Sequence, residues 1–454
     1  MLDLIVLGGG PAGYLAAERA AHKGFSVALF EMRELGGVCL NEGCIPSKAL
    51  LNSAKIYEHA KNGRKFGVLT SDIKLDNALV QQRRAKVVRT LVAGVKAKMK
   101  SGGVKVIKDK GVILGREDGG FAVEGGGEKL LAKRLLIATG SSPVTPPIPG
   151  LKEALESGFA LTNREVLTLK EVPRELVIIG GGVIGLEMAA YYNVAGSHVT
   201  VVEMLDHIAG PTDREISELL KKSCADSGVD FKLGARVTAL TQDSVKAELD
   251  GAECEFKADK VLLSIGRRAN VQGFGLETLG VETARAGIVT DEHMRTNVEN
   301  VYAAGDVNGR IMLAHTAYRE SEVAVNTMLG QRDYMRYDAI PSVIYTAPEV
   351  ASVGMTEDEA QSRGIEYDVK KLSMRYSGRF VAENEGDGLC KILVDKSRRT
   401  VLGVHMIGAY ASEMIWGAAE MIETELTVSD AREIVFPHPT VSEIIREVLW
   451  EFGD

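Results

Sequence analysis

Two segments of this 454-residue chain repeat one pattern, which limits the possible folds more than any other feature. Leu4–Glu31 reads LIVLGGGPAGYLAAERAAHKGFSVALFE, and Leu176–Glu203 reads LVIIGGGVIGLEMAAYYNVAGSHVTVVE. Each has an apolar strand, a G-x-G-x-x-G turn, an alanine-rich helix, a second apolar strand and a final glutamate at matching spacing. This order is typical of dinucleotide-binding βαβ units. The repeat therefore predicts an α/β chain with two Rossmann-like domains.

The glycines and the glutamate of each unit have distinct predicted roles. The first glycine permits a sharp turn, the second lets a pyrophosphate approach the backbone, and the third allows the helix to pack closely on the strand. The glutamate can hydrogen-bond a ribose diol. The alternative, two ordinary βαβ turns without a ligand, is disfavoured because both units are complete. The residues are Gly8, Gly10, Gly13 and Glu31 in the first unit, and Gly180, Gly182, Gly185 and Glu203 in the second.

Two such units suggest two dinucleotide cofactors, and the end of the second unit bears on the choice of nicotinamide. Glu203 would repel a 2′-phosphate, and the following Met204–His207 includes no arginine to bind one. An acidic residue at this position typically hydrogen-bonds the ribose of NAD. We therefore expect NAD rather than NADP at the second unit.

Three further apolar strands close on glycine or aspartate. They occupy Leu135–Gly140, Val261–Gly266 and Val298–Asp306. Ligands of open α/β sheets bind at the carboxyl ends of strands, so Asp306 could contact a polar part of a cofactor. The sequence Ala304-Gly305-Asp306 fits an ordinary turn equally well.

Composition and charge argue against a nucleic-acid-binding, secreted or membrane-spanning protein. The chain is 45% hydrophobic and 26% charged, and its net charge of −8 argues against a nucleic-acid-binding surface. Its N-terminus lacks the basic start and cleavage site of a signal peptide. No segment approaches the roughly 20 apolar residues that span a bilayer. We expect a cytoplasmic protein.

Only two of the five cysteines are close in sequence. Cys39 and Cys44 lie in GGVCLNEGCIPSKAL, shortly after Glu31. An odd number of cysteines in a cytosolic chain does not suggest a disulfide scaffold. No second close pair of cysteines completes a zinc site, so we expect no metal. The other cysteines are Cys224, Cys254 and Cys390.

The position of this cysteine segment beside the first dinucleotide unit suggests redox chemistry. With a helix from Asn41 to Leu51, Cys44 would lie in its first turns, where the helix dipole and free N–H groups lower a thiol pKa. Pro46 is tolerated in a first turn. The alternative is a pair of buried structural cysteines, since free cysteine is among the most buried residue types.

Several segments together make the chain resemble one enzyme family. They are the cysteine segment, the two glycine-rich units, TNVENVYAAGD at Thr296–Asp306, IMLAHTAYRE at Ile311–Glu320 and FPHPTVSE at Phe436–Glu443. Over essentially its whole length the chain resembles the dihydrolipoamide dehydrogenase family, within the pyridine nucleotide-disulfide oxidoreductases. The resemblance implies an α/β fold with two Rossmann-like dinucleotide-binding domains and a C-terminal α+β dimerisation domain.

The domain boundaries rest on the motifs, the composition and this resemblance. The proline-rich Pro143–Gly150 is typical of a linker, and an alternation of strands and helices begins near Ile340. We predict an FAD-binding domain at 1–145, an NAD-binding domain at 146–266, a central domain completing the FAD site at 267–338, and the dimerisation domain at 339–454.

The resemblance implies oxidation of protein-bound dihydrolipoamide to lipoamide, with FAD at the first unit and NAD at the second. Cys39 would be the interchange thiol and Cys44 the charge-transfer thiol facing the flavin, together forming a redox disulfide. Lys48 matches the lysine near flavin N5, with Glu187 as its partner. Without the resemblance, a lysine is usually a solvated surface residue.

The remaining site residues also come from the resemblance. His438 matches the family's acid–base histidine, and Glu443 the carboxylate that orients it. Taken alone, a histidine between prolines is more often a rigid loop residue. We further expect Gly111, Asp306 and Ala314 to contact FAD, and Val237 and Gly266 to line the nucleotide sites.

In this family the histidine comes from the other subunit, which implies a homodimer with shared active sites. The chain begins directly at the first nucleotide strand, so we expect the lipoyl group on a partner protein. That partner would be the acyltransferase of a 2-oxoacid dehydrogenase complex or the glycine-cleavage carrier protein; we expect neither nucleic acid nor membrane insertion.

The chain departs from its family at three places. Relatives usually have threonine in place of Val38, an uncharged aliphatic residue in place of Glu42, and histidine-alanine in place of Phe436-Pro437. A carboxylate at position 42 would disfavour a nearby thiolate if it pointed inward. Two alternatives stay open: an NAD(P)H-dependent reductase of another disulfide or quinone, and a redox-inactive flavin-binding subunit.

Overall fold

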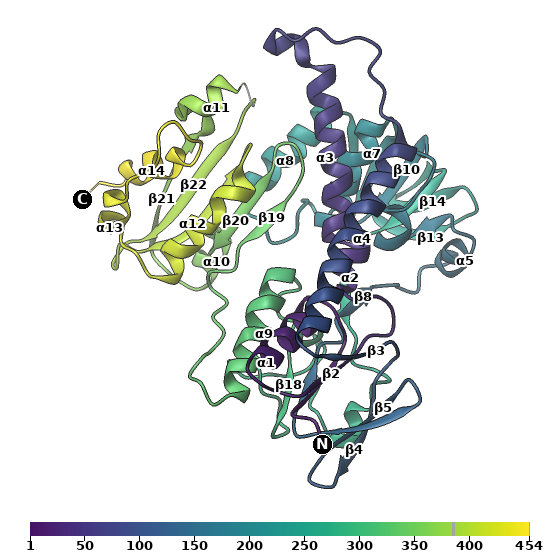
Figure 1. The fold of residues 1–454 in the computed structure, drawn as a ribbon. Coiled ribbons are helices and arrows are strands. Elements are labelled where there is room, and N and C mark those ends of the chain that lie inside the picture. Colours follow the sequence, from purple (N-terminus) through teal and green to yellow (C-terminus); the bar gives the residue numbers. More distant parts are fainter. Residues whose placement is uncertain (384–385, 454) are drawn as a thin grey trace.

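A computed structural model describes residues 1–383 and 386–453, so positions 384, 385 and 454 of the predicted C-terminal domain lie outside it. The first repeat lies at the centre of a parallel sheet with the order β18-β7-β1-β2-β3 (Figure 1). Its central strands are buried on both faces, which explains their unbroken apolar runs. The strands are β1 (Leu4–Leu7), β2 (Val27–Phe30), β3 (Lys105–Ile107), β7 (Leu135–Ile137) and β18 (Val301–Ala303).

Helices cover one face of this sheet and a small antiparallel sheet covers the other. Leu4 and Val6 pack on the helical side, whereas Ile5 and Leu7 pack on the opposite side. The helical side consists of α1 (Pro11–His22), α4 (Asn77–Ser101) and α9 (Ala314–Met328). The antiparallel sheet consists of β4 (Val112–Glu117), β5 (Gly120–Gly125) and β6 (Glu128–Ala132).

The second repeat forms a sheet of the same design, with the order β12-β11-β10-β16-β9. The repeat therefore extends beyond its sequence motif, because an antiparallel sheet also accompanies this unit. The parallel strands are β9 (Ala160–Leu161), β10 (Glu175–Ile179), β11 (His198–Glu203), β12 (Val229–Leu233) and β16 (Lys260–Leu263). The antiparallel strands are β13 (Arg236–Leu240), β14 (Ser244–Leu249) and β15 (Ala252–Lys257).

The helices of the second unit and a two-stranded ribbon complete this part of the chain. The ribbon pairs β8 (Ser141–Pro143) with β17 (Arg267–Ala269), and irregular backbone occupies most of the proline-rich stretch after β8. The helices are α5 (Leu151–Glu156), α6 (Asn163–Val166), α7 (Val183–Ala195) and α8 (Arg214–Asp226).

The C-terminal region folds around a five-stranded antiparallel sheet with the order β19-β20-β23-β22-β21. Its strands are β19 (Ser342–Ile344), β20 (Val350–Gly354), β21 (Tyr367–Ser373), β22 (Leu389–Asp395) and β23 (Val401–Ile407). Its helices are α10 (Glu357–Ser362), α11 (Gly378–Ala382), α12 (Ala411–Glu423), α13 (Val428–Glu433) and α14 (Glu443–Trp450). The predicted fold class, two Rossmann-like domains followed by an α+β domain, is confirmed.

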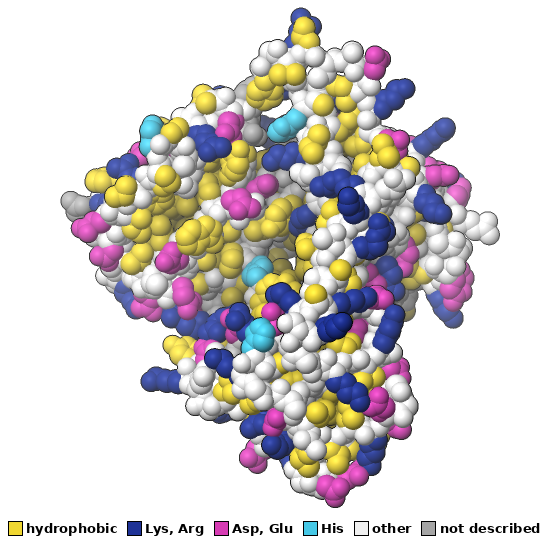
Figure 2. All heavy atoms as spheres, viewed as in Figure 1, with side chains coloured by type: hydrophobic (Ala, Val, Ile, Leu, Met, Phe, Trp, Pro, Cys, Tyr) yellow, Lys and Arg dark blue, Asp and Glu magenta, His cyan; other side chains and the backbone are white. Residues whose placement is uncertain are grey.

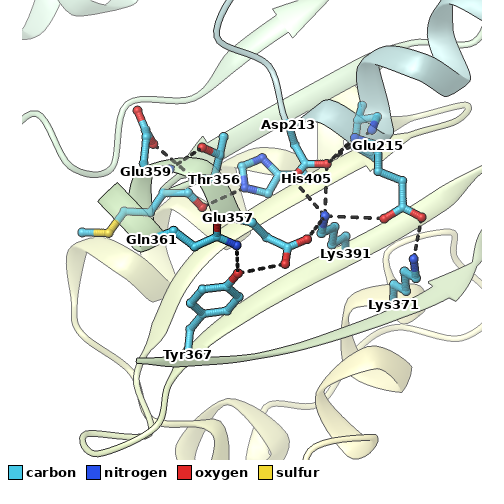
Figure 3. Close-up of polar contacts among 12 residues, drawn as sticks. Asp213, Glu215, Thr356, Glu357, Glu359, Gln361, Tyr367, Lys371, Lys391 and His405 are labelled. Atoms are coloured by element: carbon cyan, nitrogen blue, oxygen red, sulfur yellow. Dashed lines mark hydrogen bonds and ion pairs between the residues drawn. The ribbon is translucent and has the colours of Figure 1, made fainter. Parts of the chain in front are cut away.

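Buried ionic contacts join the C-terminal region to the second dinucleotide unit (Figure 3). Lys391 on β22 lies between Asp213, which precedes α8, and Glu357 on α10. The Lys391 and Asp213 side chains are each only 3% exposed. A buried charge of this kind needs its partner, because isolated charges are costly away from water.

Apolar side chains remain exposed on the C-terminal region. Figure 2 shows hydrophobic side chains gathered over this part of the molecule. The exposed large ones are Tyr376, Val381, Trp416, Ile434, Val435 and Trp450. Contiguous apolar surface of this kind typically marks a protein–protein contact. Among the described residues, no helix is both long and apolar enough to cross a membrane.

Candidate functional site

The first glycine of each repeat occupies a backbone position that only glycine accepts readily. Gly8 and Gly180 have φ angles of +103° and +105°. A Cβ atom at Gly8 would lie 2.2 Å from the Ala138 carbonyl oxygen, and one at Gly180 would lie 2.4 Å from that of Ser264. These glycines allow the turn from strand to helix beside the neighbouring strand end.

The other two glycines of each unit leave room for a ligand and bring the helix close to the strand. A Cβ atom at Gly13 would lie 1.7 Å from the Gly8 oxygen, so the helix packs directly against the turn. A Cβ atom at Gly10 or Gly182 would meet no atom closer than 3.8 Å, and the two glycines precede α1 and α7, whose N-termini have no side-chain cap. Free N–H groups and open space at both helix starts fit the pyrophosphates of FAD and NAD.

The glutamate that ends each repeat is fixed by the backbone of its own unit. Glu31 Oε2 accepts a hydrogen bond from Gly9 N at 2.7 Å, and its Oε1 accepts one from Arg33 N at 2.7 Å. Glu203 accepts the equivalent pair, from Gly181 N at 2.6 Å and Leu205 N at 2.8 Å. Both carboxylates are thus positioned with acceptor capacity left for a ribose diol.

The cysteine segment forms two helices, not one. α2 (Gly37–Glu42) carries Cys39, and α3 (Cys44–Lys61) begins at Cys44. The helix considered over Asn41–Leu51 is therefore wrong at its start, because Gly43 (φ −151°, ψ −110°) interrupts it. A Cβ atom at Gly37 would lie 2.6 Å from Gly10 Cα, so α2 begins directly against the first dinucleotide turn. That contact explains the second glycine of the pair that precedes the cysteines.

The two thiols interact and therefore have different acidities. Both are free and half-buried. A hydrogen bond from the Cys39 thiol, with help from the Lys48 cation, lowers the pKa of Cys44 to about 7 despite burial. The same hydrogen bond and burial raise the pKa of Cys39. Cys44 is thus the thiol that ionises first, and the Cys39 thiol donates a hydrogen bond to the Cys44 thiolate.

The Cys44 thiolate is expected to appear as pH rises through about 7 in the reduced protein, because its pKa is lowered from 9.0. Ultraviolet thiolate absorbance would follow this transition, and Cys44→Ser should remove it. Cys224→Ser is the matched control, since burial raises the pKa of that thiol to about 12. A transition near pH 7 that persists in Cys44→Ser would contradict the assignment.

A half-buried ion pair anchors α3 to the second dinucleotide unit. Lys48 Nζ lies 2.9 Å from each carboxylate oxygen of Glu187 on α7. Glu187 also accepts a hydrogen bond from Tyr345 N at 3.1 Å, and Lys48 Nζ lies 4.3 Å from the centre of the Tyr345 ring. The pairing that the resemblance suggested is present, whereas Tyr345, in no motif we identified, was missed.

Asp306 belongs to a polar cluster at the end of the first sheet. Asp306 Oδ2 accepts a hydrogen bond of 2.5 Å from Ser141 Oγ, and Arg267 Nε donates to the same hydroxyl at 2.7 Å. Glu320, fully buried on α9, accepts hydrogen bonds from Gly305 N at 2.6 Å and from Tyr337. In the sequence, Glu320 was indicated only by its position at the end of the IMLAHTAYRE segment.

The other predicted cofactor contacts lie at the edges of the two units. Ala314 is the first residue of α9, which has no side-chain N-cap, so its N-terminal N–H groups are available. Gly111 precedes β4 and packs against Leu7 and Phe30, where a Cβ atom would clash. The last two are Val237, which is half-buried on β13, and Gly266, which follows β16 with φ +109°.

The Glu42 carboxylate lies between two cationic side chains. Its Oε1 lies 2.8 Å from Arg164 Nε, and its Oε2 lies 3.4 Å from Arg33 Nη1. Burial nevertheless raises the pKa of Glu42, and Arg33 opposes this shift. Two arginines thus serve as counterions to the Glu42 carboxylate.

His438 and Glu443 form a pair at the outer edge of the C-terminal region. His438 Nδ1 lies 2.9 Å from Glu443 Oε1, and Thr440 N donates to Glu443 Oε2 at 2.9 Å. The Thr440 N–H and the histidine lower the pKa of Glu443. The His438 side chain is 78% exposed, and Figure 1 shows α13 and α14, which flank this loop, far from α2. One chain therefore does not bring His438 to its own cysteines.

Sequence comparisons give a consistent result. The family model described as "Pyridine nucleotide-disulphide oxidoreductase" matches residues 2–321, and the model for the dimerisation domain of the same family matches residues 340–449. A dihydrolipoyl dehydrogenase of Bacillus subtilis is 40% identical, covering 98% of this chain and 96% of the relative. One of Chlamydia muridarum is 38% identical, covering 98% and 95%.

Solved structures agree with these relatives. LpdA from Mycobacterium tuberculosis superimposes with a TM-score of 0.90 at 26% identity, covering 99% of both chains. The HOCl-induced flavoprotein disulfide reductase RclA from Escherichia coli superimposes with a TM-score of 0.85 at 26% identity, again covering 99% of both. From these matches over its whole length, the chain belongs to the pyridine nucleotide-disulphide oxidoreductase family.

Proposed function

We propose that this flavoprotein oxidises protein-bound dihydrolipoamide to lipoamide, with FAD and NAD as cofactors and Cys39–Cys44 as the redox pair. The observation that carries the proposal is the placement of two interacting thiols, Cys39 on the helix α2 that begins against the first dinucleotide turn, and Cys44 at the start of the next helix, α3. The full-length likeness to dihydrolipoyl dehydrogenases supports this choice of substrate. When bound, FAD accepts the electron pair of the cysteines and NAD accepts it as hydride.

The cysteines exchange the electron pair with the substrate through a mixed disulfide. One substrate thiolate attacks Cys39 of the oxidised pair, which forms an S–S bond to Cys39 and releases Cys44 as a thiolate. The second substrate thiol then attacks the substrate sulfur of the mixed disulfide, which closes lipoamide and releases Cys39. The low pKa of Cys44 makes it the better leaving group.

The protons of the substrate thiols need an acceptor, and we assign this role to His438 of the partner subunit. The Glu443 carboxylate holds Nδ1, so Nε2 faces outward for proton transfer. The family's dimerisation domain and the exposed apolar side chains of the C-terminal region support a homodimer with shared sites.

Residues of both dinucleotide units would hold the cofactors. The first turn and α1, with Glu31, Asp306 and the start of α9, would hold FAD, and Lys48 would place a cation near the flavin ring. The second turn and α7, with Glu203, would hold NAD. The domain boundaries given above and a cytoplasmic location remain predictions.

The chain has two candidate lipoyl partners. A 2-oxoacid dehydrogenase acyltransferase and the glycine-cleavage carrier protein would both present the same dithiol. This dithiol is the group that reacts with Cys39.

Steady-state assays test this function directly. The chain is expected to turn over dihydrolipoamide with NAD faster than NADPH with glutathione disulfide. The kcat/KM with NAD should exceed that with NADP by at least about tenfold, because Glu203 repels a 2′-phosphate. A repulsion of about 1.4 kcal/mol is enough for this ratio. Faster glutathione disulfide reduction would favour the alternative reductase, and no turnover of either pair would favour a redox-inactive subunit.

A further inference from the structure

The helix that carries Cys39 packs against α3 and α4 but buries a single side chain, Leu40, in the core. α2 has only six residues and no side-chain N-cap, and short helices are marginal without tertiary contacts. Its N-terminus rests on the first dinucleotide unit through Gly37 and Gly10. Packing against α3 fixes only part of its position, so the separation of the two sulfurs also depends on what holds its C-terminal end.

The second dinucleotide unit holds that end through α6. Asn163 Nδ2 donates a hydrogen bond of 2.6 Å to the backbone oxygen of Glu42, the last residue of α2. Helix-terminal carbonyls lack intrahelical partners, so this bond caps α2 from outside. Arg164, the next residue of α6, lies 2.8 Å from the Glu42 carboxylate. Two neighbouring side chains thus hold both the backbone and the side chain of Glu42.

α6 is itself well anchored, so it can act as a fixed point. Asn163 is 7% exposed, and its Oδ1 accepts a hydrogen bond of 3.3 Å from Arg267 Nη1, which fixes the amide orientation. Val166 is fully buried, and its carbonyl oxygen accepts a hydrogen bond of 2.5 Å from the Tyr192 hydroxyl on α7.

We propose that Asn163, supported by the Glu42–Arg164 ion pair, is a positioning residue that holds the Cys39 helix and so sets the dithiol–disulfide equilibrium. We call Asn163, Glu42 and Arg164 the α6 clamp. This inference rests on the proposed redox role of the cysteines. It also accounts for the unusual charge at position 42, which joins α2 to a domain other than its own.

The direction of the effect follows from chain entropy. A disulfide forms more readily when its two thiols are held close together, because less freedom is lost on closure. Loosening α2 lowers this advantage and makes the disulfide easier to reduce. Cys44 lies on α3, which Lys48 and Glu187 anchor separately, so its own environment should persist.

The holoenzyme is equilibrated anaerobically in dithiothreitol redox buffers, free thiols are alkylated, and mass spectrometry counts the Cys39–Cys44 disulfide. Asn163→Ala, which changes no charge, is expected to lower the equilibrium constant for disulfide formation about tenfold, a midpoint about 30 mV more positive. Glu42→Ala and Arg164→Ala should each lower it about two- to fivefold, as suits a partly exposed ion pair. The double variant should match a single one.

Arg33→Ala is the matched control, because Arg33 faces the same carboxylate but makes no link to α6. It should leave the midpoint unchanged. A charge effect alone would shift Glu42→Ala and Arg164→Ala in opposite directions, and that result would overturn the clamp. So would unchanged midpoints in all three α6-clamp variants. If the wild-type cysteines form no disulfide in any buffer, the proposed function fails first.

Discussion

Replacing His438 with alanine is expected to lower the turnover of dihydrolipoamide with NAD by about 10²–10⁴-fold, the usual contribution of a general acid–base residue. The FAD content should stay unchanged, because His438 lies at the outer edge of its own chain, away from the first dinucleotide unit. Steady-state kinetics and flavin absorbance measure these two quantities. Comparable turnover in the variant would show that another group takes the proton.

Glu443→Gln separates orientation of the ring from proton transfer. The amide keeps the size of the side chain but removes the charge that holds Nδ1 at 2.9 Å. Turnover should fall less than in His438→Ala, because the imidazole is still present but loses the carboxylate that orients it. Glu447→Gln on the same helix is a matched control that should leave turnover unchanged, since Glu447 pairs with Arg446 instead.

Mixed dimers test whether each site takes residues from two chains. Cys39→Ser and His438→Ala homodimers should both be nearly inactive. A heterodimer of the two variants has one site that combines an intact cysteine pair with an intact histidine. It is expected to recover about half of the wild-type activity if His438 acts in the partner subunit. An inactive heterodimer would place His438 and the cysteines in the same chain.

The sequence predicted those residues of the site whose roles depend only on their neighbours along the chain. Gly8 and Gly13 needed only the βαβ pattern, because their roles concern one turn and one helix. Glu31 was predictable for the same reason. The break at Gly43 was not, since helix propensity alone allows a helix from Asn41, and the close approach of Gly43 to Val38 appears only in the folded chain.

Contacts between distant segments were beyond the sequence patterns. Asn163 and Arg164 lie in an unremarkable stretch, and nothing in it indicates that they meet Glu42. Likewise β18 follows the first unit by more than half the chain but completes its sheet. The resemblance supplied roles for single residues, whereas the structure supplied the network that holds them.

Lys391 gives the largest expected effect on stability. Its Nζ lies 3.0 and 3.2 Å from the two oxygens of Asp213, 3.5 Å from Glu215, and in contact with Glu357 (Figure 3). Burial alone would lower the Lys391 pKa, but the hydrogen bonds with Glu357 and Asp213 raise it overall. The lysine thus stays charged, and it is the buried cation that compensates these carboxylates.

Lys391→Met should therefore lower the free energy of unfolding by about 3–5 kcal/mol, because it leaves the carboxylate of Asp213 buried without its cation. Asp213 also caps α8, accepting hydrogen bonds from Glu215 N and Ile216 N, so it cannot simply turn away. Both tryptophans of the chain, Trp416 and Trp450, lie in the C-terminal region, so their fluorescence during urea unfolding follows the affected part.

Two companion variants separate lost charge balance from lost packing. Lys371→Met removes a lysine that is 52% exposed and contacts only Glu215 among these carboxylates, so it should change stability by less than about 1 kcal/mol. Lys391→Met combined with Asp213→Asn removes charges of both signs. It should be more stable than Lys391→Met alone, because the remaining buried carboxylate is then neutralised. If the double variant is instead the least stable of the three, packing of the lysine stem, not its charge, holds this junction together.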